Sequence, residues 1–223
     1  MARQNKYRER SKLSEAKTRE LVRYFVLDLQ AVQITALTGL NRNTVNSYLT
    51  YFRQQIAKAC EKEFPFKGDI ELDESYFGGK RIKGKRGRGA YKKIPVFGLF
   101  KRNGKVFTQV VPNCSRPVLQ AIVKGKVTFD STLHTDGWRA YNGLVDLGYK
   151  KHYRVNHGIN EFATKESTIN GIENFWGLAK VRLAKYRGLS RNTFYLHLKE
   201  CEWRFNYRSE NLYKKLLDLL KNA

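Results

Sequence analysis

The 223-residue chain has little cysteine, few acidic residues and no long apolar segment. Its three cysteines, Cys60, Cys114 and Cys201, lie far apart and form no CxxC pair. This spacing excludes a zinc ribbon and gives no support to a disulfide framework, so we expect buried, reduced thiols. No apolar run reaches about 18 residues, which excludes a membrane-spanning helix, and we expect no membrane partner.

The scarcity of acidic residues is the stronger signal. Asp and Glu together number 20 against 43 Lys and Arg, for a formal net charge of +23. Hydrophobic residues make up 41% of the chain and aromatic residues 13%, which is enough for a core and excludes global disorder. This length holds one sizeable domain and a smaller one. Because a strongly cationic surface attracts polyanions, the composition favours nucleic acid as the partner.

A helical segment is predicted after the basic N-terminal arm MARQNKYRERSKL. Ser14 is suited to cap a first helix, and a second helix fits 31–38 and ends at Gly39. Asn41 or Asn43 is suited to cap a longer third helix. A short helix, a glycine-containing turn and a longer helix are typical of a helix-turn-helix.

In that interpretation the start of the third helix reads base edges of DNA in the major groove. A plain three-helix packing module is the alternative. The polar residues available for reading bases near the N-terminus of the third helix are Arg42, Asn43, Asn46 and Ser47.

The rest of the chain alternates strand and helix patterns. Strands are predicted over DIELDESYF, IPVFGLF, KVFTQVV, 129–135 and KKHYRVN, and helices over 116–125, 138–147, 169–186 and 192–220. Three early strands followed by alternating helices and strands indicate a mixed α/β domain.

One glycine-rich segment, residues 78–93, holds eight Lys and Arg and no acidic residue. Its self-repulsion favours a polyanionic partner that orders it, although a solvated basic loop is the alternative. The residues that we expect to contact DNA phosphates are Arg81, Lys83, Lys85, Arg86 and Arg88.

Three acids stand in distinctive settings within this basic chain: Asp73 in IELDESYFGG, Asp136 in HTDGWRAY and Glu173 in INGIENFW. Carboxylates that converge from different elements hold the divalent ions used in phosphoryl transfer, and hard oxygen ligands select Mg²⁺ or Mn²⁺. Taken singly, an Asp at a strand end is usually a cap or a turn residue, and a Glu in an early helical turn usually complements the helix dipole. Composition alone does not separate the first of them from its neighbours Asp69, Glu71 and Glu74.

Together, ELDESYFGGKRIKGKRGRG, IPVFGLFKRNGKVFTQVVPNCSR, HTDGWRAYNGL, RVNH and INGIENFWGLAK resemble the DDE transposases of bacterial insertion sequences, in the ISXO-like group. The resemblance covers about residues 66–207. It implies an RNase H-like fold, a metal site of three acids, and transposition by cleavage and joining of DNA strands. Many relatives begin with a zinc ribbon, and this chain has none, so recognition of the element ends falls to the helical N-terminus.

Residue by residue, Asp73 matches the first acid of the family pattern, Asp136 the second and Glu173 the third. Lys180 follows Glu173 by seven positions, two helical turns, and matches a basic residue that contacts DNA. These four residues are the catalytic, metal-binding and DNA-binding positions that the resemblance implies.

We therefore expect three parts: a DNA-binding domain over 1–66, a catalytic domain over 67–190 and a helical extension over 191–223. The expected protein is a transposase in the bacterial cytoplasm, associated with the nucleoid. It acts on double-stranded DNA, both element ends and target, as a homodimer or higher oligomer. A catalytically silent regulator derived from a transposase and an RNase H-like nuclease are the alternatives.

Overall fold

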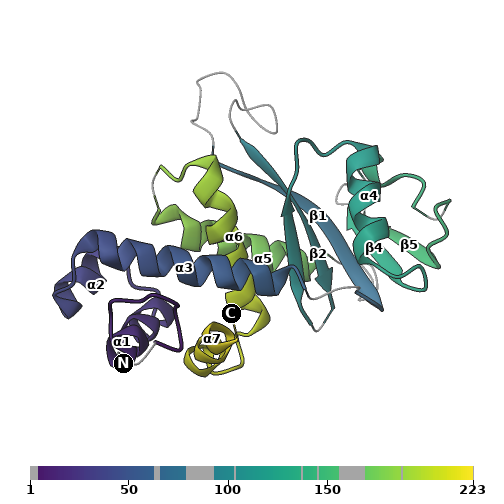
Figure 1. Cartoon of the computed structure of the whole chain (residues 1–223). Coiled ribbons are helices and arrows are strands. Elements are labelled where there is room, and N and C mark those ends of the chain that lie inside the picture. The colour runs from purple at the N-terminus through teal and green to yellow at the C-terminus, as the bar shows by residue number, and fades with distance from the viewer. Residues whose placement is uncertain are drawn as a thin grey trace, which may run out of the picture. The chain divides into compact units, whose positions relative to one another are not determined.

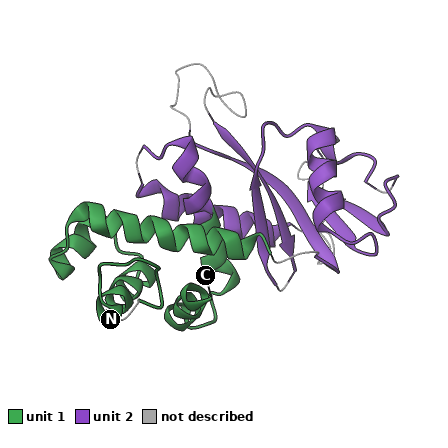
Figure 2. Cartoon of the chain, in the orientation of Figure 1, with its two compact units in different colours: residues 1–62, 199–223 green, residues 63–198 purple. Residues whose placement is uncertain are grey.

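A computed structural model describes eight ranges of the chain, and Figure 1 labels their elements. The described residues are 5–62, 66–78, 93–102, 104–136, 138–144, 146–155, 169–186 and 188–222. The chain divides into two compact units (Figure 2): unit 1 joins residues 1–62 to 199–223, and unit 2 spans 63–198. No helix in the described ranges is both long and apolar enough to cross a membrane.

Unit 1 is helical. Its elements are α1 (Glu15–Val26), α2 (Ala31–Thr38), α3 (Arg42–Cys60), the second part of α6 (Arg191–Asn206) and α7 (Leu212–Lys221). Ser14 caps α1 as predicted, since its hydroxyl accepts from the Lys17 backbone N–H at 3.2 Å. Gly39 ends α2 with a φ of +66°, a left-handed conformation that favours glycine. The cap of α3 is Asn41, whose side chain accepts from the Asn43 backbone N–H at 2.8 Å.

The predicted single helix over 192–220 is wrong, because the chain breaks between α6 and α7. Asn211 caps the new helix by accepting from the Lys214 backbone N–H at 3.0 Å. Trp203 on α6 and Leu216 on α7 lie in the same hydrophobic cluster as the apolar faces of α1 and α3. The C-terminal residues therefore complete the core of the N-terminal helices.

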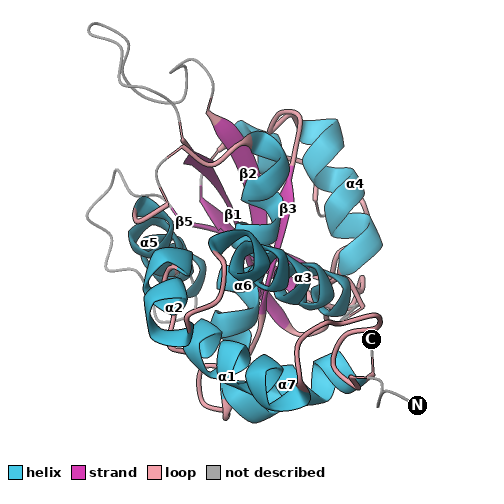
Figure 3. Ribbon diagram, turned by 60° about the vertical axis from the view of Figure 1, so that its left-hand side comes forward, coloured by secondary structure: helices cyan, strands magenta, loops and turns pink. Residues whose placement is uncertain are grey.

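Unit 2 contains a five-stranded mixed sheet in its described part (Figure 3). Its elements are β1 (Asp69–Phe77), β2 (Ile94–Lys101), β3 (Val106–Val110), α4 (Arg116–Lys126), β4 (Thr132–Asp136), η2 (Arg139–Tyr141), β5 (Lys151–Val155) and α5 (Asn170–Ala184). The strand order is β3-β2-β1-β4-β5; β1, β2 and β3 pair antiparallel, whereas β4 pairs parallel with both β1 and β5. This mixed α/β arrangement is compatible with an RNase H-like fold.

The two faces of the sheet are covered by different helices. Ile70 and Leu72 of β1 join a buried cluster with Leu119 and Val123 of α4. The alternate residues of β1 face α5, which packs on β1 and β2. The polar row of β1 is therefore enclosed by a helix.

The helix predicted over 138–147 is wrong. This segment holds one turn of 3-10 helix, η2, followed by turns. Gly143 has a φ of +78°, which a continuous right-handed helix does not allow. The apolar periodicity was still informative, because Tyr141 and Leu144 are buried in the core of unit 2.

Candidate active site

The three acids come from three different elements of unit 2. Asp73 lies within β1, Asp136 is the last residue of β4, and Glu173 lies in the first turn of α5. The parallel pairing of β1 with β4 sets Glu71 beside His134. The pairing of these two strands ends at Glu71 and His134, and Asp73 and Asp136 each lie two residues beyond it.

Helix α5 reaches this edge because two glycines allow a close approach. Gly98 of β2 is the cross-strand partner of Asp73. A Cβ atom on Gly98 would meet the Ile172 side chain at 2.9 Å and the Trp176 ring as well. A Cβ on Gly171 would likewise lie 2.9 Å from Oε2 of Glu71. Larger residues at these glycines would push α5 away from the sheet.

Trp176 uses this approach to reach Asp73. Its indole Nε1–H donates to Oδ2 of Asp73 at 3.1 Å, and the tryptophan itself is 4% exposed. Trp176 lies one helical turn beyond Glu173 on the same helix. A buried donor at a fixed position holds the carboxylate in one orientation.

Glu71, the nearest competitor on the same face, has a structural role. Its Oε1 accepts from Nε of Arg102 at 3.1 Å, and its Oε2 accepts from the Ile172 backbone N–H at 2.9 Å. The side chain is 4% exposed. Glu71 therefore ties the start of α5 to β1. Its partner Arg102 was not predicted from the sequence to have a role.

The two other competitors also have partners. Glu74 points to the opposite face of β1, where the Tyr141 hydroxyl donates to its Oε2 at 2.7 Å. Asp69 lies at the start of the strand, with Oδ1 at 3.2 Å from Nε2 of the buried His134. The structure thus separates Asp73 from its neighbours by environment, which composition alone did not do.

Asp73 lies in a field of negative charge. Its pKa is raised from the ordinary 3.8 to about 7, chiefly by burial and in addition by the carboxylates of Glu74, Asp136 and Glu173. A lowering contribution comes from a backbone hydrogen bond at Glu74. Although the protein has a net charge of +23, the charged neighbours that shift the pKa of Asp73 are carboxylates. Such a group is stabilised in its charged form by a bound cation.

The donor chemistry fits a hard divalent cation, since carboxylate oxygens are the ligands that Mg²⁺ and Mn²⁺ prefer. Among the residues that the structure describes, however, no three or more His, Cys, Asp or Glu side chains are grouped as a metal site. Asp136 instead accepts a hydrogen bond on Oδ1 from the Trp138 backbone N–H at 3.0 Å. The three acids therefore come from β1, β4 and α5 of one unit, but in the described residues they do not form a coordination sphere.

The predicted DNA-binding residues fall into three places. Lys180 is exposed on α5 and lines a cavity of about 440 Å³ together with Phe77 and Phe194. Three others are exposed at the start of α3 in unit 1: Arg42, Asn43 and Asn46. The residues of the basic segment lie outside the described ranges: Arg81, Lys83, Lys85, Arg86 and Arg88.

The strand order and the flanking helices define a class: mixed α/β proteins with a five-stranded sheet in the order β3-β2-β1-β4-β5. Within that class, residues 65–206 match the ISXO2-like transposase domain, and the chain belongs to this family. The inference of an insertion-sequence transposase is thereby confirmed.

Two curated relatives are similar to this chain. An uncharacterized transposase-like protein of Haemophilus influenzae is 46% identical over 102 residues, which are 46% of this chain and 81% of that protein. An uncharacterized protein in transposable element ISH50 of Halobacterium salinarum is 28% identical over 191 residues, 76% of this chain. This second match spans 64% of the length of the relative.

Proposed function

We propose that this transposase binds the terminal inverted repeats of its insertion sequence and catalyses divalent-metal-dependent cleavage and strand transfer of DNA. The observation that carries the proposal is the family match over residues 65–206, which includes Asp73, Asp136 and Glu173. The electrostatic interaction of Asp73 with the other two acids supports it.

In this proposal Asp73, Asp136 and Glu173 hold Mg²⁺ or Mn²⁺. The bound ions would supply activation of the attacking oxygen and stabilisation of the leaving oxygen. Trp176 fixes the orientation of Asp73 through the indole hydrogen bond. Glu71 fixes the position of Glu173 indirectly, because it anchors the backbone of the residue before it.

The proposed DNA contacts are divided between the N-terminal helices and the catalytic domain. Residues 1–66 form the proposed DNA-binding domain, 67–190 the catalytic domain and 191–223 a helical extension. The helix-turn-helix of α2 and α3 reads element ends with Arg42, Asn43 and Asn46. Phosphates near the reacting strand are held by Lys180 and by Arg81, Lys83, Lys85, Arg86 and Arg88. Because two ends must be joined, the chain acts as a homodimer or a higher oligomer on DNA.

A single substitution with a matched control tests the catalytic part. Asp73→Asn should lower Mg²⁺-dependent nicking of a duplex carrying the element end by at least about 1,000-fold, on the order of 4 kcal/mol of barrier. Asp69→Asn removes a carboxylate from the same strand, in its pair with His134, and should leave nicking within about threefold, under 1 kcal/mol. Binding of the same duplex is measured separately by fluorescence anisotropy.

The outcomes separate the competing functions. Nicking that survives intact in Asp73→Asn rules out the catalytic role of this residue. Binding by the unmutated protein without any metal-dependent nicking identifies a silent regulator. Nicking without joining of a pre-nicked end to a target plasmid identifies a nuclease.

A further inference from the structure

The basic N-terminal arm is folded from residue 5 onward. The side-chain amide of Asn5 donates to the Thr18 hydroxyl at 3.0 Å and to the Leu13 carbonyl oxygen at 2.9 Å. Its carbonyl oxygen accepts from the Tyr7 backbone N–H at 2.9 Å. Tyr7 is 3% exposed and belongs to the hydrophobic core of unit 1. Residues 5–13 are therefore anchored against the helices of this unit.

Arg8 is held on the surface of α3. Its guanidinium donates to Oγ of Ser47 at 3.0 Å. The guanidinium carbon lies 4.5 Å from the ring centroid of Tyr48 and 5.0 Å from that of Tyr51. A hydrogen bond between the Ser11 and Tyr48 hydroxyls fixes the arm at a second point. These contacts keep a positive charge at a defined place beside the start of α3.

Beside these contacts, the arm and α3 together line a cleft of about 600 Å³. Residues 8–13 form one wall, and Asn43, Thr44, Ser47 and Tyr48 form the other. The first wall carries three basic side chains and one acidic side chain, and the second carries amide and hydroxyl groups. Cations combined with neutral hydrogen-bond donors are the groups that proteins direct at DNA phosphates.

Two of the cations in this cleft are well placed to bind an incoming anion. Arg10 has a φ of +53°, a conformation that is uncommon outside glycine, and its side chain is 91% exposed. Its ion pair with Glu9 spans 3.6 Å in solvent and is weak for that reason. Lys12 is also exposed. A phosphate in the cleft would form ion pairs with both side chains, and only the weak ion pair between Arg10 and Glu9 would be lost.

We propose that this cleft binds a backbone phosphate of double-stranded DNA and so sets the register of α3 on the element end. The proposal rests on the DNA-binding function of unit 1 proposed above. It also divides the tasks of the exposed residues on α3. Asn43 lines the phosphate cleft, whereas Arg42 and Asn46 lie outside its lining and serve base edges.

The test compares two double variants that each remove two exposed charges from unit 1. Arg10→Gln with Lys12→Gln changes the cleft, and Lys58→Gln with Lys62→Gln changes the opposite end of α3 and the turn after it. Affinity for a duplex carrying the element's inverted repeat is measured by anisotropy between 50 and 200 mM salt. The cleft variant should reduce the slope of log affinity against log salt by about 1 to 2. The control variant should keep the wild-type slope.

Ethylation of single phosphates locates the contact. Ethylation at one position of the repeat should weaken binding of the wild type and should have no effect on the cleft variant. Equal losses in the two variants would overturn the cleft and leave DNA binding intact. Displacement of the duplex by inorganic phosphate beyond the effect of chloride at equal ionic strength would identify a free-anion site and overturn the commitment to DNA. A wild type that does not bind the duplex overturns the proposed function together with the cleft.

Discussion

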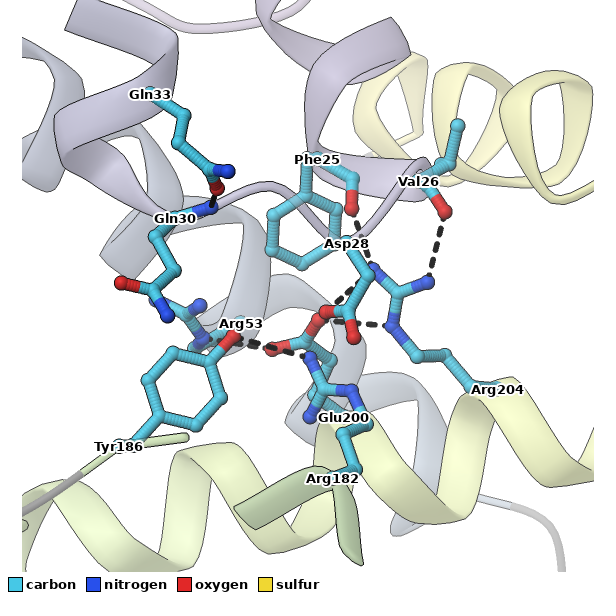
Figure 4. A network of polar contacts seen from close by, with 10 residues as sticks. All are labelled: Phe25, Val26, Asp28, Gln30, Gln33, Arg53, Arg182, Tyr186, Glu200 and Arg204. Carbon is cyan, nitrogen blue, oxygen red and sulfur yellow. Dashed lines mark hydrogen bonds and ion pairs between the residues drawn. The ribbon is translucent and has the colours of Figure 1, made fainter. Parts of the chain in front are cut away.

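Glu200 of unit 1 and Asp73 of unit 2 are carboxylates in opposite electrostatic surroundings. In unit 1, Glu200 is fully buried and accepts from Nε of Arg53 at 2.8 Å and from Nε of Arg204 at 2.9 Å (Figure 4). In unit 2, the electrostatic neighbours that raise the pKa of Asp73 are other carboxylates, those of Asp136 and Glu173 among them. A shortage of cations does not explain the difference, because Lys and Arg outnumber Asp and Glu by 43 to 20.

The same contrast holds for other buried charges of unit 1. Lys199 is fully buried, with Nζ at 3.1 Å from Oε2 of Glu202 and 3.0 Å from Oε1 of Glu61. Charges that are paired on folding are structural, since each compensates the desolvation of the other. Carboxylates gathered near one another oppose folding and are typical of functional sites. The comparison is consistent with a stabilising role for the network of unit 1 and with the proposed catalytic role of Asp73 in unit 2.

Removing the shared anion of unit 1 should have the largest effect. Glu200→Ala leaves the buried guanidinium groups of Arg53 and Arg204 without their common carboxylate, and should lower the free energy of unfolding by about 3 to 5 kcal/mol. Glu210→Ala breaks an ion pair with Lys215 in which both side chains are 40% or more exposed, and should cost less than about 1 kcal/mol. Urea denaturation of both variants measures the difference. Equal losses would show that the buried network has no special role.

Closing the space beneath Trp176 should have the next largest effect. Gly98→Ala forces the indole and Ile172 away from β2, and should cost about 1 to 3 kcal/mol. Gly177→Ala on the same helix meets no atom within 4 Å, and should instead stabilise by about 0.5 to 1 kcal/mol. Thermal unfolding distinguishes the two signs. Stabilisation by both substitutions would contradict the close packing of α5 on the sheet.

Neutralising Asp73 should have a smaller, pH-dependent effect on stability. Its pKa is about 7 when folded against 3.8 ordinarily, so the folded state binds more protons than the unfolded state between these values. The wild type therefore loses stability as pH rises from about 4 to about 7. Asp73→Asn should match the wild type near pH 4. At pH 8 without divalent cations the variant should be more stable by about 2 kcal/mol, half of the roughly 4 kcal/mol that the full pKa difference gives, because Asp73 is only half-buried and solvent screens its charge. Urea denaturation at the two pH values measures the difference in the free energy of unfolding. A variant that is less stable than the wild type at pH 8 would contradict the unfavourable burial and repulsion of the Asp73 carboxylate.

Much of the helical unit could be predicted from sequence because its signals are local. Ser14 and Gly39 act through their own turns, and both delimit helices as predicted. The two helix predictions that were wrong, over 138–147 and 192–220, failed because backbone conformation and capping, and not the spacing of apolar residues, decide where those helices end. The helix predicted over 138–147 does not form, because Gly143 adopts a backbone conformation that stops a helix. The helical pattern over 192–220 likewise did not indicate the break before Asn211, which caps the start of a new helix.

The candidate site could be predicted only in part. Motif resemblance selected Asp73, whereas its distinction from Glu71 and Glu74 depends on partners far along the chain, such as Arg102 and Tyr141. No local pattern encodes those contacts. The close approach of α5 could have been predicted from Gly98, because a glycine inside an apolar strand often marks the close approach of another element.

The proposal that Asp73, Asp136 and Glu173 hold a divalent cation is tested most directly by binding of Mn²⁺, followed by electron paramagnetic resonance of the remaining free ion. The wild type should bind Mn²⁺ at pH 8, and Mg²⁺ should compete for the same site. Asp73→Asn and Asp136→Asn should each weaken binding by at least about tenfold, or 1.4 kcal/mol, while Asp69→Asn should bind as the wild type does. Equal Mn²⁺ binding by all four proteins would contradict the assignment of these acids to a metal site.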